Sequence, residues 1–445
     1  MNRDIFMNLL EAKEYKAVRS ILNVMNAVDI ASLLSELEDK ALALAFRLIP
    51  KDKAADVFAE MSGDMQANLV EMFTERELRD ILSELYMDDT VDLIEDLPAN
   101  LVTRILENVS PEKREEINRL LNYPPDSAGS IMTTEYVDLR PSNTVAEAMV
   151  HIKRTGIHKE TIYTCYVLES RRLLGIVSAK DLMTLDDEMT MEEMMDTEII
   201  SVSTDTDKED VAKLFSKYSL LAVPVLDGDG RMVGIVTVDD AVDVMVDEAT
   251  EDISKMAAIN PSEKSYFETS VFRHALSRLP WLLVLMLSAT ITGSILENYE
   301  AAFAAIPILV TFIPMIMDTG GNCGAQSSTL MIRGMALDEI RFSDIFKAVF
   351  KEFRVSLIVS AVLAIANGIR IFIMYPDLDL TITFVVCISL MFTVMMAKLI
   401  GCILPLLAKK IHLDPAIVAS PVITTIVDAC SLAIYFAIAS SLLGI

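Results

Sequence analysis

Apolar and polar residues in the first 124 positions recur with the three- and four-residue spacing of amphipathic helices. Gly is almost absent from this stretch, and Pro falls only at boundaries between apolar groups. The segment Leu34-Ser-Glu-Leu37 returns as Leu82-Ser-Glu-Leu85, and Pro50 returns as Pro98, each displaced by 48 residues. A repeat of this kind predicts short helices stacked into a superhelical, all-α domain.

The pattern changes at Tyr123-Pro-Pro-Asp-Ser-Ala-Gly129, after which β-rich stretches alternate with helical ones. The segment Leu174-Gly-Ile-Val-Ser-Ala-Lys-Asp181 recurs 59 residues later as Val233-Gly-Ile-Val-Thr-Val-Asp-Asp240. Each copy predicts a buried strand that runs into a helix, with Ser or Thr at the N-cap and Asp in the first turn. A duplicated α/β module is therefore expected.

This duplicated Gly-apolar-apolar-Ser/Thr-x-x-Asp pattern resembles the tandem pair of CBS modules. Helix capping alone is one interpretation of its polar residues. The resemblance implies a second, in which the hydroxyl and the carboxylate hold the phosphate and ribose of an adenine nucleotide such as ATP. The candidate nucleotide-binding residues are Ser178, Asp181, Thr237 and Asp240.

The chain from Asp239 to Asp252 reads as one acidic helix. Its carboxylates stand at positions 239, 240, 243, 247, 248, 251 and 252, and like charges three and four residues apart destabilise a helix. A solvated helix face is the simpler interpretation. Because no basic stretch nearby balances this run, which connects the α/β region to the first apolar segment, bridging divalent cations are the alternative.

Five apolar segments follow, each long enough for the roughly 20 residues that a membrane-spanning helix needs. They lie near residues 276–297, 302–332, 353–375, 380–408 and 416–443. Lys and Arg gather before the first segment and in the second and fourth connecting loops, whereas the first and third loops hold none. The positive-inside rule then predicts cytoplasmic N-terminal domains and an outside C-terminus in the cell membrane.

Polar residues inside these segments are candidates for function, because hydrocarbon penalises them unless they pair or face water. The second segment contains Pro314-Met-Ile-Met-Asp-Thr-Gly-Gly-Asn-Cys-Gly-Ala-Gln-Ser-Ser-Thr329, and the last contains Pro421-Val-Ile-Thr-Thr-Ile-Val-Asp428. The glycines alone can serve close helix packing. Asp428 is different: a carboxylate in mid-span predicts a residue that faces a cavity, and the proline before it can free carbonyl ligands.

Charge is divided unevenly along the chain. Residues 1–278 carry a net charge of −25 and residues 279–445 only −2, which disfavours nucleic acid as a partner and attracts cations. The five cysteines show no paired spacing, and the four histidines lie outside the apolar segments. Oxygen ligands remain, and they suit a hydrated Mg²⁺ held by one or two carboxylates, either through water or between two chains.

The order of these regions, with Thr319-Gly-Gly-Asn-Cys-Gly-Ala-Gln326 in the second span, Pro421-Val-Ile-Thr-Thr-Ile-Val-Asp428 in the fifth and the acidic string Glu248-Ala-Thr-Glu-Asp252, resembles the MgtE family of magnesium channels. The resemblance implies a homodimer in membrane lipid, with a pore between the subunits and Asp428 binding hydrated Mg²⁺. Cytosolic Mg²⁺ would close this pore by bridging the acidic cytoplasmic domains. The chain is then a multidomain membrane protein and not an enzyme.

The resemblance assigns residues and domains by position. The pore candidates are Asp428, Asn322, Thr424, Pro421, Gly320 and Gly321. The Mg²⁺-sensing candidates are Asp88, Asp92, Asp207, Glu209, Asp240, Asp243, Glu248, Glu251, Asp252 and Asp414. The expected parts are a superhelical N-terminal domain (1–124), two CBS modules (125–188 and 189–246), a connecting or plug helix (247–273) and a transmembrane domain of five helices (274–445).

Two positions depart from the family pattern: Ser219 stands where an acidic residue is expected, and Cys430 stands where a polar or small residue is expected after Asp428. Asp240 is a candidate both for ribose and for Mg²⁺. Other functions also stay open, namely transport of Co²⁺ or Mn²⁺, and a membrane sensor with CBS modules but no transport. A membrane enzyme is disfavoured, because no nucleophile and base pair or HExxH motif accompanies a span.

Overall fold

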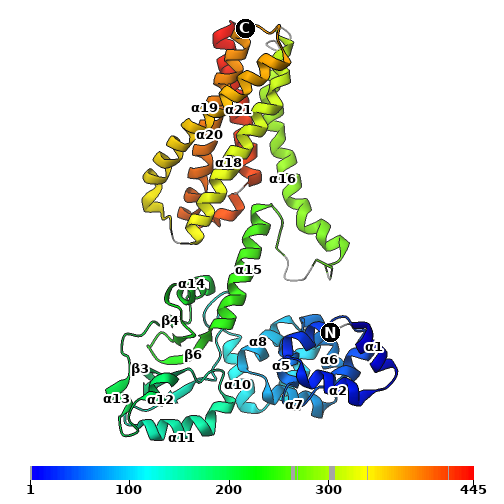
Figure 1. The fold of residues 1–445 in the computed structure, drawn as a ribbon, viewed down its shortest axis with the longest axis vertical. Helices are drawn as coiled ribbons and strands as arrows, with labels where there is room; N and C mark the ends of the chain where they lie inside the picture. Colours follow the sequence, from blue (N-terminus) through cyan, green and yellow to red (C-terminus); the bar gives the residue numbers. More distant parts are fainter. Residues whose placement is uncertain are drawn as a thin grey trace. The chain divides into compact units, whose positions relative to one another are not determined.

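The computed structural model describes residues 3–261, 266–267, 269–299, 306–337, 339–418 and 420–444. Contacts within the chain divide it into two compact units, Met1–Val246 and Asp247–Ile445 (Figure 1). The first unit contains the helical N-terminal domain and the α/β modules, and the second contains the long apolar helices.

In the residues that the structure describes, the N-terminal domain consists of ten short helices. They are α1 (Arg3–Glu11), α2 (Tyr15–Val24), α3 (Ala27–Leu34), α4 (Asp39–Phe46), α5 (Ala54–Ala59), α6 (Gly63–Met72), α7 (Glu75–Glu84), α8 (Met87–Asp96), α9 (Ala99–Asn108) and α10 (Pro111–Leu120). From α3 to α10, each helix packs against the next but one, as in a superhelical stack. Helices α6 to α10 begin twelve residues apart, so the 48-residue sequence repeat spans four helices. The prediction of stacked short helices is confirmed.

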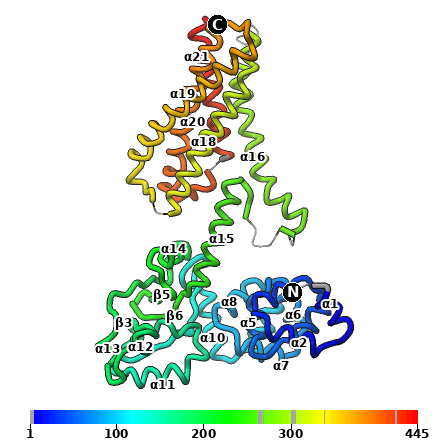
Figure 2. Tube along the Cα trace, viewed as in Figure 1, coloured from blue at the N-terminus to red at the C-terminus, as the bar shows by residue number. Residues whose placement is uncertain are grey.

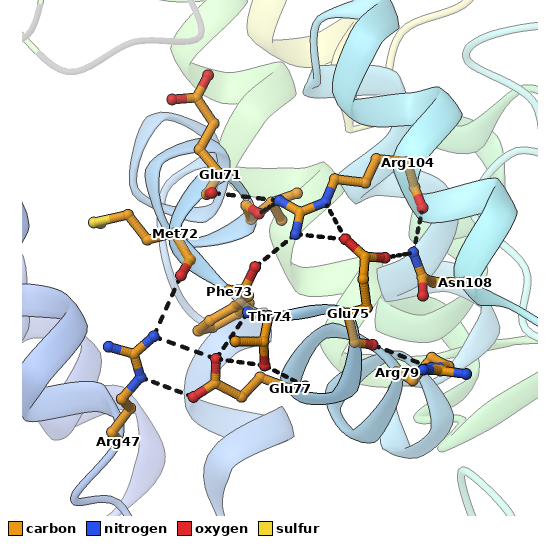
Figure 3. Close-up of polar contacts among 11 residues, drawn as sticks. Arg47, Glu71, Met72, Phe73, Thr74, Glu75, Glu77, Arg79, Arg104 and Asn108 are labelled. Carbon is orange, nitrogen blue, oxygen red and sulfur yellow. Dashed lines mark hydrogen bonds and ion pairs between the residues drawn. The ribbon is translucent and has the colours of Figure 1, made fainter.

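Two arginines hold the corner between α6 and α7 (Figure 3). Arg104 donates to the carbonyl of Phe73 at 2.5 Å and to the carboxylate of Glu75 at 2.9 Å. Arg47 donates to the carboxylate of Glu77 at 2.8 Å, and this hydrogen bond lowers the pKa of Glu77 to about 2. The last carbonyls of a helix have no partner within it, so these side chains satisfy groups that the short α6 leaves open.

Lysines repeat this arrangement elsewhere in the stack. Lys113 donates to the carbonyls of Leu82 and Leu85 at 2.8 and 2.7 Å, at the end of α7. Lys53 donates to the carbonyls of Asn23 and Met25 in the same way, at the end of α2. Helices this short are marginal on their own, so cationic caps and the buried apolar faces stabilise them together.

The α/β part contains two small sheets with the same topology. The elements are β1 (Val137–Leu139), α11 (Val145–Thr155), η1 (Gly156–His158), β2 (Thr164–Glu169), β3 (Arg172–Ser178), α12 (Ala179–Thr184), α13 (Met191–Met194), β4 (Val202–Ser203), α14 (Lys208–Tyr218), β5 (Ala222–Leu226) and β6 (Met232–Thr237). In both sheets the first two strands pair in parallel and the last two antiparallel, with a register shift in the same place. The predicted duplication is confirmed.

Helix α15 (Val238–Met256) begins directly after β6 and runs as one helix through the boundary between the units at Val246. Its first turns therefore belong to the second α/β module. The acidic run lies along its length, and its last turn packs in the second unit beside the apolar helices.

The described part of the second unit contains five long helices. They are α16 (Val271–Asn298), α18 (Ile313–Ala336), α19 (Ile345–Met374), α20 (Leu380–Lys410) and α21 (Ser420–Leu443), joined in part by the short helices η2 (Pro307–Phe312), η3 (Phe342–Asp344) and η4 (Pro415–Val418). Helix α18 packs against both α20 and α21, and α19 packs against α20 (Figure 2). The Tyr435 hydroxyl donates to the Leu309 carbonyl at 2.9 Å, which joins η2 to α21.

Within the described residues, four segments are long and apolar enough to cross a membrane. They are Val271–Asn298, Phe342–Met374, Leu380–Lys410 and Pro415–Leu443. Helix α18 has sufficient length but lower hydropathy, because its polar side chains interrupt the apolar sequence. The segment predicted at 302–332 thus falls partly outside the described residues and partly on α18.

Candidate ion-binding sites

Helices α18 and α21 approach each other closely beside Asp428. A Cβ atom on Gly321 would lie 3.1 Å from Cγ2 of Thr424 and 3.9 Å from Oδ1 of Asp428. A Cβ atom on Gly320 would lie 2.8 Å from Cγ2 of Thr393 and 2.9 Å from Oγ of Ser431. The two glycines therefore permit a helix contact that no larger residue allows without displacement, and that contact places Asp428 against the α18 backbone.

One face of α18 is polar although the helix lies among apolar helices. Asp318, Asn322 and Gln326 follow one another at four-residue spacing, and all three side chains are exposed in the single chain. The Asp318 carboxylate also lies close enough to Asp428 for their charges to interact. Because hydrocarbon does not tolerate such a stripe, it must face water or another protein surface.

Pro421 is the second residue of α21, where a missing backbone N–H leaves no hydrogen bond unmade. Its carbonyl accepts hydrogen bonds from the hydroxyls of Thr424 and Thr425 at 2.9 and 3.0 Å. Among the predicted pore residues, Gly320, Gly321, Thr424 and Asp428 thus surround one contact, Asn322 lies on the polar face of α18, and Pro421 orients the threonines. Cys430 is half-buried, two residues beyond Asp428.

A second group of carboxylates gathers within the first unit, where α8 meets the start of α15. Desolvation and the charge of Asp240 raise the pKa of Asp88 well above its usual range, and those of Asp89 and Asp92 to about 6 and about 7. Desolvation and the charges of Asp239 and Asp240 raise the pKa of Glu160 to about 8. The predicted residues Asp88, Asp92 and Asp240 therefore share one electrostatic cluster.

The repulsion between these carboxylates can be relieved in two ways. Carboxylates that repel one another favour either protons or a cation between them, and oxygen-rich surroundings suit hard divalent ions. Within the described ranges, no three Asp, Glu, His or Cys side chains converge closely enough to hold a metal directly. A hydrated ion, held through its water shell, matches this spacing better than a bare one.

The remaining predicted carboxylates make local contacts. Asp207 caps α14 through the amide of Glu209 at 2.8 Å, and Glu209 pairs with Lys213 at 2.9 Å. In the second unit, Lys255 pairs with both Glu251 and Asp414, which brings these two predicted ligands together. Partial burial opposes the charge of Lys255, but hydrogen bonds to the two carboxylates outweigh it and raise its pKa.

The other candidate carboxylates, Asp243, Glu248 and Asp252, lie on α15, and their role as ligands stays a prediction. Ser219 ends α14 in the left-handed region, with φ of 54°. The position where an acidic residue was expected is therefore a helix end, and a short polar side chain suits its backbone.

The candidate nucleotide residues form a matching hydroxyl–carboxylate pair at the start of a helix in each module. Ser178 Oγ donates to Asp181 Oδ2 at 2.5 Å, and Thr237 Oγ1 donates to Asp240 Oδ2 at 2.6 Å. The Asp181 amide donates to Ser178 Oγ at 3.1 Å, which confirms the predicted N-cap in the first module. In the second module, the Thr237 hydroxyl and amide both donate to the Asp240 carboxylate. Nucleotide binding at these residues stays a prediction, and in the second module Asp240 also belongs to the carboxylate cluster with Asp88.

Comparisons with known proteins agree with this architecture. Residues 25–126 match the model of the MgtE intracellular N domain, residues 128–188 and 191–247 match CBS domains, and residues 313–438 match MgtE, a divalent cation transporter family. The "Magnesium transporter MgtE" of Thermus thermophilus is 36% identical over 439 residues, which cover 98% of this chain and 97% of the relative. This chain belongs to the MgtE family.

Further relatives support the assignment to MgtE. The "Magnesium transporter MgtE" of Bacillus subtilis is 33% identical, with 97% of this chain and 95% of the relative covered. A solved structure described as "the cytosolic domain of the Mg2+ channel MgtE in complex with ATP" is 35% identical, with a TM-score of 0.52, and covers 55% of this chain and 100% of its own. A second, "the soluble part of a magnesium transporter", is 32% identical, also with a TM-score of 0.52, and covers 56% and 98%. This MgtE chain is a membrane protein with a CBS pair.

Three charged residues of these sites were missed in the sequence. Asp318 was detectable, because it stands four residues before Asn322 and so shares a helix face with it. Asp89 lies beside a residue that was identified. Glu160 gave no signal, because it lies between η1 and β2 and only tertiary packing brings it to the cluster.

Proposed function

We propose that this chain mediates Mg²⁺ uptake across the cell membrane as a channel or transporter. The observation that carries the proposal is Asp428, a carboxylate within a membrane helix, held directly against Gly321 of α18. Membership of the MgtE family and the names of its curated relatives support the choice of Mg²⁺ over other divalent ions. Oxygen ligands alone also suit Mn²⁺ or Co²⁺, so the uptake of these ions has to be measured beside that of Mg²⁺.

The pore is formed between two copies of the chain. Support comes from the exposed stripe of Asp318, Asn322 and Gln326, which needs water or a polar surface at membrane depth. In a homodimer, two such stripes face each other across the axis, and the two Asp428 carboxylates contribute to one ion path. Each ion then meets enough oxygen atoms through its own hydration shell.

The acidic cytoplasmic domains sense Mg²⁺ and close the pore. At low Mg²⁺, the carboxylates around Asp88 and Asp240 repel one another and loosen the contact between α8 and α15. Bound Mg²⁺ removes this repulsion and favours the compact arrangement. A shift from mostly open to mostly closed requires about 5 kcal/mol of differential binding, which several weak sites supply together.

Adenine nucleotide, with ATP as the first candidate, binds at the CBS pair. The duplicated pairs Ser178–Asp181 and Thr237–Asp240 support this, because each lies at a helix N-terminus and presents a hydroxyl and a carboxylate. The relative solved with ATP is a cytosolic domain that aligns over its full length with 55% of this chain. The N-terminal domains are cytoplasmic and the C-terminus lies outside the cell, as the distribution of Lys and Arg predicts.

The deciding experiment is Mg²⁺ uptake into proteoliposomes by the wild type and by Asp428→Asn, with cytoplasmic-side Mg²⁺ varied. Asp428→Asn keeps the size of the side chain and removes its charge. The matched control is Asp377→Asn, an exposed carboxylate in the loop between α19 and α20. We expect uptake to be lost only in the first variant, and to be suppressed by cytoplasmic-side Mg²⁺ in the wild type.

Two results would contradict the proposal. Normal uptake by Asp428→Asn would remove this residue from the ion path. Absence of wild-type flux for Mg²⁺, Mn²⁺ and Co²⁺ alike would favour a membrane sensor without transport.

A further inference from the structure

Three polar side chains from three different helices meet inside the membrane unit. Ser327 of α18 donates to Glu352 of α19 at 2.8 Å, and Lys398 of α20 donates to the Ser327 hydroxyl at 3.3 Å. The Lys398 ammonium lies 3.9 Å from the Glu352 carboxylate. All three residues are buried, with exposed fractions of 0% for Ser327, 6% for Glu352 and 4% for Lys398.

A buried ion pair in such a place requires an explanation. Removing two charges from water is costly, and apolar residues of similar size often stabilise a protein more than the pair does. Ionisable residues within membrane helices therefore indicate a function by default. Neither Glu352 nor Lys398 lies in the Asp428 contact, so ion binding there does not account for them.

The network is joined to the Asp428 contact through the backbone of α18. Gly324 lies three residues before Ser327, and its carbonyl oxygen would be 2.2 Å from a Cβ atom on Gly401 of α20. A Cβ atom on Gly324 would lie 3.3 Å from the carbonyl of Ala397, which directly precedes Lys398, and 2.9 Å from Cγ2 of Ile423 in α21. The α18 backbone at Gly324 is therefore in close contact with both α20 and α21.

The position of Ser327 on α18 links the network to the Asp428 contact. Ser327 lies six residues beyond Gly321, so a rotation or shift of α18 at Ser327 moves Gly321, Asn322 and the Asp428 contact with it. Apolar packing alone allows small sliding movements between helices. A chain of hydrogen bonds from an ammonium through a hydroxyl to a carboxylate can form in only one register of the helices.

We propose that Glu352 and Lys398 are positioning residues, which act through Ser327 to fix the register of α18 and thereby the ion selectivity of the path beside Asp428. The inference rests on the proposed transport function. The pair does not touch the ion, and its effect passes through α18.

The test compares Glu352→Gln, Lys398→Met and the double variant with the wild type in proteoliposomes. The readouts are the Mg²⁺ concentration at half-maximal uptake, the ratio of Mg²⁺ to Ca²⁺ uptake, and thermal unfolding in detergent. Each single variant leaves one buried charge without its partner. The double variant removes both charges, so no unpaired charge remains. We expect the double variant to unfold near the wild-type temperature, with the Mg²⁺ to Ca²⁺ ratio lowered at least about fivefold.

Two further variants keep the test decisive if the double variant does not fold. Ser327→Ala removes only the hydroxyl between the charges and is expected to lower the ratio in a folded protein. Lys398→Arg keeps the charge and is expected to retain more of the ratio than Lys398→Met. The control is Lys347→Met, which breaks the exposed ion pair of Lys347 with Asp344 near the start of α19.

The outcomes separate the inference from the proposed function. If the wild type transports Mg²⁺ but the folded double variant and Ser327→Ala keep both the wild-type ratio and the wild-type half-maximal concentration, the pair only stabilises the fold and the inference is wrong. If the wild type transports no divalent ion at all, the proposed function fails, and the inference with it.

Discussion

The ammonium of Lys255 lies 2.7 Å from the carboxylate of Asp414 and also pairs with Glu251, one turn earlier on α15. This contact joins the end of α15 to the residue that precedes η4 and α21. Both carboxylates are predicted Mg²⁺ ligands. A cation that belongs to the chain therefore occupies the space between them, and a divalent ion has to displace it.

Replacing Lys255 by Met should make closure more sensitive to Mg²⁺. The variant leaves Glu251 and Asp414 without their ammonium partner, so they bind a divalent cation more strongly. Because the ion pair is partly exposed, it contributes less than about 1 kcal/mol of free energy. The half-closing Mg²⁺ concentration should therefore fall by about three- to fivefold. The half-closing concentration is measured by titrating Mg²⁺ in two assays, uptake and protection of the full chain from protease.

Lys347→Met is the matched control, because this lysine pairs with Asp344, a carboxylate that is not among the predicted Mg²⁺ ligands. An unchanged or higher half-closing concentration in Lys255→Met would mean that the ion pair itself supports the closed form.

Stability should depend on pH through the carboxylate cluster. Asp89, Asp92, Asp240 and Glu160 have folded-state pKa values of about 6, 7, 6 and 8, above the ordinary values of unfolded carboxyl groups. The folded chain thus holds more protons than the unfolded one at neutral pH. The stabilisation is fully present below about pH 4 and is lost as pH rises through 6 to 8, on the order of 1 kcal/mol per group.

The measurement is thermal unfolding of the full chain in detergent from pH 5 to 8.5, with and without Mg²⁺. Without Mg²⁺ the first unit should unfold at lower temperature as pH rises. Added Mg²⁺ should restore the temperature, and more strongly at high pH. Asp240→Asn should flatten the pH dependence, and a profile that is the same with and without Mg²⁺ would argue against a cation site in the cluster.

Sequence patterns predicted the parts of this protein that depend on periodicity. The amphipathic spacing and the repeat of Leu34 at Leu82 indicated stacked helices, and both leucines are buried. The duplicated strand-to-helix motif indicated the α/β pair. Ser178 caps α12 as expected, and Thr237 instead bonds to the Asp240 carboxylate at the start of α15. Asp428 is a candidate because a lone carboxylate in an apolar run has few structural roles, and its part in ion transport stays a prediction.

Residues that act through tertiary contacts were not predictable in this way. Glu352 and Lys398 are 46 positions apart, on helices α19 and α20. Lys398 is a single charge within an apolar run, whereas Glu352 is one of several charges that precede one. Their partner Ser327 is an ordinary small residue of a third helix. No periodicity within one helix reports which faces of α18, α19 and α20 meet, so the network becomes visible only in the structure.

Gly321→Ala should impair transport without unfolding the protein. Its Cβ atom would lie 3.1 Å from Thr424 and 3.9 Å from the Asp428 carboxylate, so α18 and α21 must move apart beside the ion path. Overpacking of this kind costs about 1–3 kcal/mol, and we expect uptake at least about tenfold lower. Gly293→Ala on α16 is the control, because nothing lies within 4 Å of its Cβ position.

Wild-type uptake by Gly321→Ala would show that the close contact between α18 and α21 is not needed for conduction. Gly320→Ala offers a stricter comparison. Its Cβ atom would meet Thr393, Ser431 and Val427 at 2.8 to 3.0 Å, so it should reduce both uptake and thermal stability.

Cysteines placed on the polar face of α18 should cross-link two copies of the chain. Asp318, Asn322 and Gln326 are exposed along one helix face that hydrocarbon cannot cover, and a two-fold axis would bring identical positions together. We expect Asn322→Cys to form a disulfide-linked dimer under mild oxidation in membranes. Val362→Cys on α19, an exposed apolar position, should stay monomeric on a denaturing gel, as should the wild type with its own five cysteines. If Asn322→Cys instead reacts only with water-soluble thiol reagents, α18 faces an aqueous path within one subunit, and the pore does not lie between two chains.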